Sequence, residues 1–167
     1  MIEIPLTRGY VAIVDDDCPE EILTKKWRAL VERNGNVYAV RSAPRKSGRQ
    51  PLDLLHRVIM RAPAGLDVDH IDGDGLNNRR SNLRACTHTE NGRNRKLSKN
   101  NTSGLKGVNA REAGKWQAMI KTSGRILHLG VFDSKMEAAK AYDAAALRLY
   151  GEFARTNAAL GLIDGEP

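Results

Sequence analysis

Cysteine is scarce in this chain: Cys18 and Cys86 are the only two among its 167 residues. Two cysteines cannot build the framework of a disulfide-rich secreted domain, so a reducing, cytoplasmic environment is expected. There is also no C-x-x-C pair, which argues against a four-ligand structural zinc site even though His88 lies close to Cys86.

Long hydrophobic runs are missing as well. No segment approaches the roughly eighteen apolar residues that span a bilayer, and residues 2–7 are too short and polar for a secretory signal peptide. A membrane partner is therefore not expected. Hydrophobic residues still make up 41% of the chain, which is enough to form a core in one ordinary domain or in two small ones.

Positive charge is in excess, and it is concentrated in one segment. The chain carries 27 Lys and Arg against 20 Asp and Glu, a formal net charge of +7. Residues 93–131 hold nine basic side chains and a single acid, Glu112, whereas residues 51–92 have a net charge of −1. Such a basic stripe is expected of a protein that binds a phosphate backbone, although a solvated linker would carry the same charge.

Hydrophobic periodicity and turn residues predict short elements in the first half of the chain. The expected elements are short strands around a turn in 2–14, a helix opening at the acidic turn 15–21 and containing Ile22 and Trp27, a hairpin at Asn34-Gly35-Asn36, a strand at 37–40, a polar loop at 45–51, and a helix at 52–60 stopped by Pro63 and Gly65.

Residues 68–94 predict a strand, a loop, a second strand and a helix in fewer than thirty residues. The strands are expected at 68–71 and 83–86, with the loop at 72–78. Thr87 and Glu90 have the T-x-x-E spacing of a capping box, so a helix is expected to start there.

This compact unit carries side chains suited to phosphodiester hydrolysis. Asp69 and His70 are adjacent on a strand and point to opposite sides of it. Packing the strand pair against the helix would bring Asp69 near Asn91 and His70 near Asn82. Carboxylate and amide oxygens suit a hard cation such as Mg²⁺. A neutral imidazole can take a proton from water when its other nitrogen is held. Taken singly, each asparagine is more often a turn or cap residue.

The order and spacing of these residues resemble those of HNH homing endonucleases of phages and introns. The resemblance rests on LHRVIM, VDHIDGDGLNNRRSNL and TENGRN, and residues 1–50 resemble the leader of such enzymes. It implies a ββα-metal unit in which Asp69 and Asn91 hold Mg²⁺ (or Mn²⁺), His70 activates water and Asn82 orients His70. His56, in the first motif, either touches the active site or packs a helix.

A second unit, residues 103–157, is predicted to be a three-stranded sheet with one helix. The strands are expected at 107–109, 115–121 and 125–132. A helix over 136–150 follows a capping box of Ser134 and Glu137, and it ends at Gly151.

This second unit resembles the Apetala-type (ethylene-response-factor-like) DNA-binding domain, which inserts one sheet face into the major groove. Asn109, Ala113, Met119 and His128 stand where the plant domains usually have Arg, Trp, Glu and Trp, so plant target specificity is not expected here. Alternation turns Trp116 toward the helix. Ten residues are expected to contact DNA: Asn109, Arg111, Gln117, Lys121, Arg125, His128, Lys106, Arg93, Arg95 and Lys96.

The sequence therefore predicts an α+β protein in five segments. These are a leader (1–50), an HNH core (51–94), a basic linker (95–102), a DNA-binding domain (103–157) and a tail (158–167). The expected function is metal-dependent cleavage of double-stranded DNA at a preferred site, in the cytoplasm of a bacterial or phage-infected cell. One nuclease site per chain favours a monomer that nicks one strand, or a dimer if both strands are cut. A non-catalytic DNA-binding transcriptional regulator is the alternative. An RNA-directed protein is disfavoured because the sheet lacks an exposed aromatic pair for stacking bases.

Overall fold

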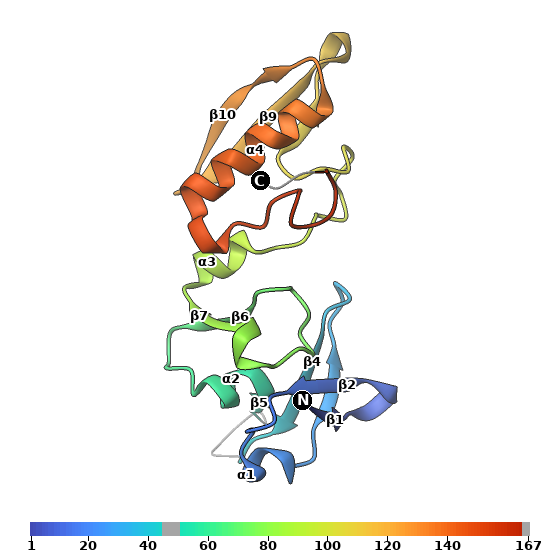
Figure 1. Ribbon diagram of the computed structural model, residues 1–167. Coiled ribbons are helices and arrows are strands. Elements are labelled where there is room, and N and C mark those ends of the chain that lie inside the picture. Colours follow the sequence, from blue (N-terminus) through green and yellow to red (C-terminus); the bar gives the residue numbers. More distant parts are fainter. Residues whose placement is uncertain (45–50, 165–167) are drawn as a thin grey trace. The chain divides into compact units, whose positions relative to one another are not determined.

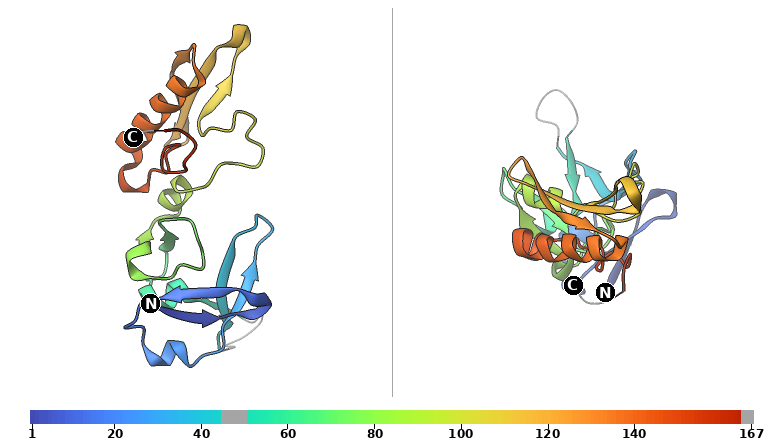
Figure 2. Two further views of the ribbon diagram at one scale, coloured as in Figure 1. Left: turned by 45° about the vertical axis from the view of Figure 1, so that its right-hand side comes forward. Right: turned by 90° about the horizontal axis from the view of Figure 1, so that it is seen from above.

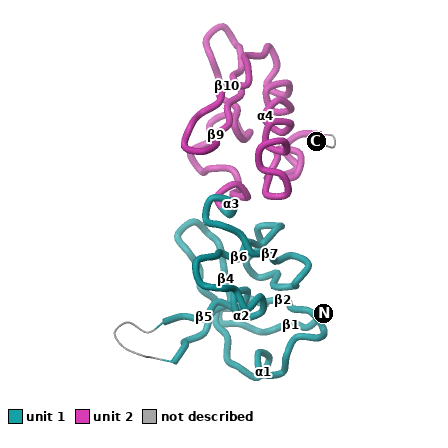
Figure 3. Tube along the Cα trace, turned by 90° about the vertical axis from the view of Figure 1, so that its left-hand side faces the viewer, with its two compact units in different colours: residues 1–91 teal, residues 92–167 magenta. Residues whose placement is uncertain are grey.

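The computed structural model describes residues 1–44 and 51–164, and it separates into two compact units, residues 1–91 and 92–167 (Figure 3). Both units combine helices with antiparallel sheets, so the predicted α+β class is confirmed. In the described part of the chain no helix is long and apolar enough to cross a bilayer.

The first unit is built from short strands and single-turn helices (Figure 1). Its elements are β1 (Ile2–Pro5), the 3-10 turn η1 (Thr7–Gly9), β2 (Val11–Val14), α1 (Glu20–Leu23), β3 (Arg28–Val31), β4 (Val37–Ser42), β5 (Leu52–Leu54), α2 (Leu55–Met60), β6 (Asp67–His70), the 3-10 turn η2 (Arg80–Asn82) and β7 (Leu83–Cys86). The strands form three antiparallel sheets, β1-β2, β3-β4-β5 and β6-β7.

Two predicted helices are shorter than expected. The helix expected to contain Ile22 and Trp27 is a single turn, because the Trp27 indole N–H donates to the Ile22 carbonyl at 2.9 Å and the chain then turns into β3. Residues 52–54 are a strand rather than the start of a helix, since they pair with β4. The predicted polar loop at 45–51 lies, except for its last residue, outside the described residues.

The loop between β6 and β7 is attached to the N-terminal strands. Ile13 donates to the Leu76 carbonyl and accepts from the Asn78 amide, both at 2.8 Å. Gly75 lies so close to β4 that a β-carbon there would be 2.7 Å from the Tyr38 ring. The segment expected to be a leader therefore folds together with the nuclease motif in one unit.

The second unit is a three-stranded sheet with a long helix along one face (Figure 2). Its elements are α3 (His88–Arg93, which spans the boundary), β8 (Val108–Ala110), the 3-10 turn η3 (Glu112–Gly114), β9 (Trp116–Thr122), β10 (Arg125–Phe132), α4 (Lys135–Tyr150) and the 3-10 turn η4 (Gly151–Phe153). The strands and helix lie where the sequence predicts them, and both sides of the Ser134–Glu137 capping box are formed.

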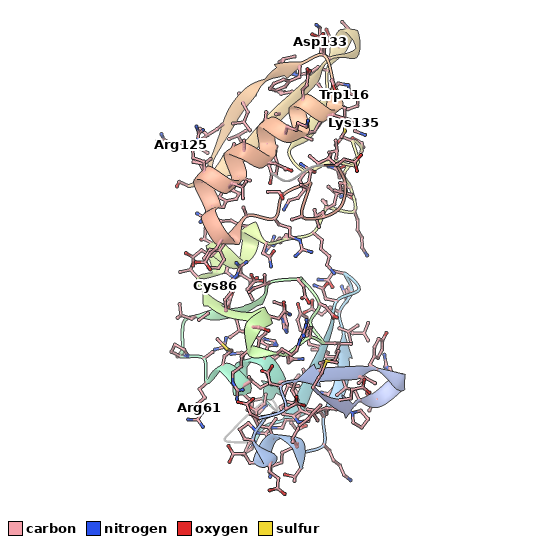
Figure 4. The ribbon with its side chains drawn as sticks, in the orientation of Figure 1. Arg61, Cys86, Trp116, Arg125, Asp133 and Lys135 are labelled. Carbon is pink, nitrogen blue, oxygen red and sulfur yellow. The ribbon has the colours of Figure 1, made fainter. Side chains whose placement is uncertain are left out.

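Alternation along β9 decides which face of this sheet meets α4. Ala118 and Ile120 are buried against the alanine-rich side of the helix, in clusters that include Ala139 and Ala146. Trp116 packs at the edge of the same core, as predicted, and the Lys135 ammonium lies 5.4 Å from its ring centre (Figure 4). Among the elements that the structure describes, no helix or strand of this unit packs on the other face of the sheet.

Buried polar bonds anchor the segment that follows α4. The Asp143 carboxylate, 2% exposed, accepts from the Asn157 backbone and side chain at 2.7 and 2.8 Å. The Asn157 side chain in turn accepts from the Lys106 backbone at 2.6 Å and donates back to its carbonyl at 3.2 Å. The C-terminal segment is thereby fixed both to α4 and to the chain entering β8.

Candidate active site and DNA-binding face

The β6–β7 hairpin and α3 place the predicted catalytic residues. Asp67 is opposite Cys86 and Asp69 is opposite Arg84 in the antiparallel register. α3 starts directly after β7, where the Thr87 backbone and hydroxyl both donate to the Glu90 carboxylate at 2.8 Å. This confirms the predicted capping box.

Asp69 and Asn91 lie on the same side of β6. Asp67 and Asp69 share that side because alternate residues of a strand do. The Asn91 amide donates to the Asp67 carboxylate at 3.2 Å, and both this bond and the neighbouring His88 lower the pKa of Asp67. The direct partner of Asn91 is therefore Asp67, which is not among the predicted site residues. Its position two residues before Asp69 on the same strand is the signal that could have identified it.

Asp69 itself is engaged by an arginine. Its carboxylate accepts from Arg84 Nη2 at 2.7 Å and from Arg84 Nε at 3.0 Å, and its side chain is only 7% exposed. The cross-strand pairing of β6 with β7 creates this ion pair, so the sequence could indicate it only once the register was known.

His70 points to the other side of β6, into a cluster of rings. Its ring centre is 4.8 Å from that of His56 in an edge-to-face arrangement and 6.0 Å from that of Tyr38. Burial lowers the pKa of His70 below its ordinary value, and burial together with the neighbouring His70 lowers the pKa of His56 to about 3. Both rings are thus neutral at pH 7, and His56 contacts the predicted catalytic base directly.

The asparagine that contacts His70 is Asn78. Its side-chain oxygen lies 3.4 Å from His70 Nε2, its amide donates to the Leu76 carbonyl at 2.9 Å, and the residue is 1% exposed. An oxygen beside Nε2 favours the tautomer with hydrogen on that nitrogen, which leaves the lone pair on Nδ1.

Asn82, which is predicted to orient His70, bonds within the loop through its side chain. The Asn82 oxygen accepts from the Asp72 backbone at 3.0 Å, and its amide donates to the Asp72 carboxylate at 2.9 Å and to the Asn77 carbonyl at 2.8 Å. Asn82 ends the 3-10 turn η2, which directs its side chain across the loop rather than toward the ring. It therefore fixes the shape of the loop that carries Asn78.

The oxygen donors on the Asp69 side of β6 fit a hydrated hard cation. Mg²⁺ is usually held by one or two carboxylates, with waters and substrate phosphate completing its shell. In the described part of the chain no three His, Cys, Asp or Glu side chains gather as in a closed metal site. Two acids and an amide on one side of a strand belong to the open type, and a cation bound there would share Asp69 with Arg84.

The predicted DNA contacts divide into exposed and engaged residues. Seven of the ten are exposed: Arg95, Lys96, Asn109, Arg111, Lys121, Arg125 and His128. Figure 4 shows Arg125 and Asp133 at opposite ends of β10. Arg93 is half-buried, with its guanidinium 4.8 Å from the Tyr150 ring centre.

The remaining two expected contacts are engaged inside the unit. Gln117 is 6% exposed and its side chain pairs with His128. Lys106 donates to the Arg95 carbonyl at 2.8 Å, and its burial lowers its pKa to about 8. Alternation along β9 correctly predicts which face of the sheet carries Gln117. Its burial is explained only by His128, its neighbour on the adjacent strand.

Comparison with known proteins identifies relatives of both parts of the chain. A family model described as HNH endonuclease matches residues 53–93. The chain is 37% identical to protein 3.8 of Escherichia phage T7 over 94 residues, which cover 56% of this chain and 77% of the phage protein. It is 34% identical to an uncharacterized HNH endonuclease of Acanthamoeba polyphaga mimivirus over 109 residues, or 62% of this chain and 56% of that protein.

The C-terminal part is similar to plant transcription factors. An ethylene-responsive transcription factor of Arabidopsis thaliana is 53% identical over 58 residues, which cover 34% of this chain and 23% of that protein. The chain thus spans most of the phage relative, about half of the mimivirus relative and under a quarter of the plant relative.

Proposed function

The chain belongs to the HNH endonuclease family, and from this membership we propose that it is a metal-dependent, homing-type endonuclease that cleaves double-stranded DNA at a preferred site. The second unit, with its similarity to plant transcription factors, is proposed to target the cleavage.

One observation carries the proposal: β6 presents oxygen donors on one side and a neutral imidazole on the other. Asp69 and Asn91 are the proposed ligands of Mg²⁺, which Mn²⁺ can replace. The bound cation would supply positive charge at the scissile phosphate. His70 is the proposed base, and its lowered pKa keeps it able to accept a proton from water at neutral pH.

The positioning of His70 is assigned to Asn78. With the Nε2 hydrogen held toward the Asn78 oxygen, Nδ1 is the atom that accepts the proton. Asn82 acts one step further away, because it braces the loop that carries Asn78. Attack by water on phosphorus with departure of the 3′ oxygen leaves 5′-phosphate and 3′-hydroxyl ends.

A nicking assay on supercoiled plasmid and phage DNA tests the proposal. We expect Mg²⁺-dependent nicking by the full chain. His70→Ala and Asp69→Ala should lower it by at least a hundredfold while DNA affinity, measured in chelator, stays within a few-fold. Asp16→Ala is the matched control for loss of a carboxylate, because the Asp16 side chain is 80% exposed. Full cutting by either site variant would refute the assignment.

A second candidate is a DNA-binding regulator that does not cut. The similarity of the C-terminal part to transcription factors supports it. The same assay separates the two functions, because a regulator would bind DNA and show no metal-dependent nicking at any protein concentration.

A further inference from the structure

The uncovered face of the second unit's sheet carries exposed hydrophobic side chains. Since Ala118 and Ile120 of β9 pack against α4, their neighbours Gln117, Met119 and Lys121 lie on the opposite face. The register of β10 sets Val131 opposite Gln117, His128 opposite Met119 and Ile126 opposite Lys121. Because directly paired residues share a face, Ile126 and Val131 lie on the uncovered side.

Ile126 and Val131 are each 59% exposed. Exposed apolar side chains on a sheet face are available to contact apolar groups of a partner. Ile126 and Val131 are not part of the core, whereas Leu129 and Phe132 of the same strand pack against it. Their exposure therefore calls for an occupant with an apolar feature of its own.

The charge around these residues identifies that occupant as DNA. Lys121 pairs directly with Ile126, lies on the same face and is exposed. This face belongs to the segment of residues 93–131, which has nine basic side chains and one acid. A second copy of the chain would bring the same positive charge against itself, whereas a DNA backbone would neutralise it.

The apolar feature that duplex DNA offers in its major groove is the 5-methyl group of thymine. The major groove also admits a two-stranded β-ribbon such as β9–β10. We propose that Ile126 and Val131 contact thymine methyl groups, so that the preferred site carries thymine where these two side chains reach the groove. This inference rests on the DNA binding assigned above and adds the chemical group that is read.

Base analogues test the inference with the full chain. A preferred duplex is first selected from a random-sequence DNA library in EDTA, so that it is not cut. Each thymine in it is then replaced by uracil, which keeps the pairing edge and removes only the methyl group. We expect about a fourfold loss of affinity at each contacted position, the value for one buried methyl group, and no change elsewhere.

Variants of the sheet face separate methyl contacts from phosphate contacts. Ile126→Ser and Val131→Ser remove the methyl groups that would contact thymine, and each should abolish the thymine–uracil difference at one position. Lys121→Gln is the control: it should weaken binding to thymine and uracil duplexes equally and reduce the salt dependence by about one phosphate contact. Unchanged thermal unfolding verifies the fold of each variant.

Three results would overturn the inference. Equal affinity for thymine and uracil at every position of the selected site would rule out the methyl contact without contradicting the proposed DNA binding. Concentration-dependent dimerisation lost in Ile126→Ser would assign the face to a second copy. Failure of the library to yield any bound duplex would instead refute the proposed function itself.

Discussion

Asn78 and Asn82 lie on one loop, yet their side chains serve different neighbours. Asn78 reaches His70 because its backbone is bonded to Ile13 of β2, which turns its side chain inward. Asn82 is bonded within the loop and meets Asp72 and Asn77. Substitution of Asn78 should therefore affect the proposed base, His70, whereas substitution of Asn82 should affect the stability of the loop.

The pH dependence of nicking tests the position of Asn78. Burial lowers the pKa of His70, so in the parent chain the rate should rise with pH, with its midpoint below 6.5, and then reach a plateau. Asn78→Asp keeps an oxygen beside Nε2 and adds a negative charge, which favours the protonated ring and should shift this rise to higher pH. Asn78→Leu should lower kcat about tenfold to a hundredfold with KM nearly unchanged.

Asn82→Ala provides the comparison for that measurement. It should lower the unfolding temperature and leave the pH midpoint of the remaining activity where it is. An unmoved midpoint in Asn78→Asp, with the variant folded, would show that Asn78 has only a structural role.

At the scale of elements, the basic unit was more predictable than the nuclease unit. β9, β10 and α4 were found from alternation, turn glycines and a capping box, because these signals are local. In the first unit, the helical spacing of Leu52 to Met60 predicts a helix that includes residues 52–54, and only the pairing of β5 with β4 makes these three residues extended. Long-range pairing overrides local periodicity where elements are this short.

Gly107 tests how closely β8 approaches α4. Its φ is +69°, and a β-carbon there would lie 1.9 Å from the Tyr142 ring and 2.7 Å from the Met119 carbonyl oxygen. Gly107→Ala should therefore destabilise the protein by about 2 to 3 kcal/mol beyond the cost of backbone strain alone. Calorimetric or circular-dichroism melting measures this loss.

Gly114→Ala is the matched control, since Gly114 has a φ of +70° and no atom within 4 Å of the added β-carbon. Its loss should be limited to about 1 kcal/mol from the positive φ. Equal losses in the two variants would contradict the close packing of β8 against α4.

For the whole molecule, chemistry and charge are divided between two units with separate cores. The core of the first unit is formed by β1 to β4 and α2, and the clusters of the second by β8, β9 and α4. The proposed catalytic residues belong to the first unit, and the whole basic stripe of residues 93–131 belongs to the second. DNA cleavage and DNA binding should accordingly be separable.

Removal of residues 101–167 tests this division. The deletion takes away five of the nine cations of the stripe, so DNA affinity should fall and the slope of log affinity against log salt should become shallower. Some metal-dependent nicking should remain, because no core residue of the first unit is lost. A shortened chain that kept full affinity and full site choice would show that the first unit alone selects the DNA.

The sequence by itself determined what depends on residue type and spacing. It located the basic stripe, the Asp69-His70 pair with Asn91 downstream, and the sheet face that turns away from α4, because charge, motif order and two-residue alternation are properties of the chain. Only the tertiary structure decided which partner each polar group meets. The Asn78 side chain lies beside the His70 ring while that of Asn82 bonds within the loop, Asp67 bonds Asn91, and Arg84 pairs with Asp69, since strand register and a bond from β2 set these contacts across the fold.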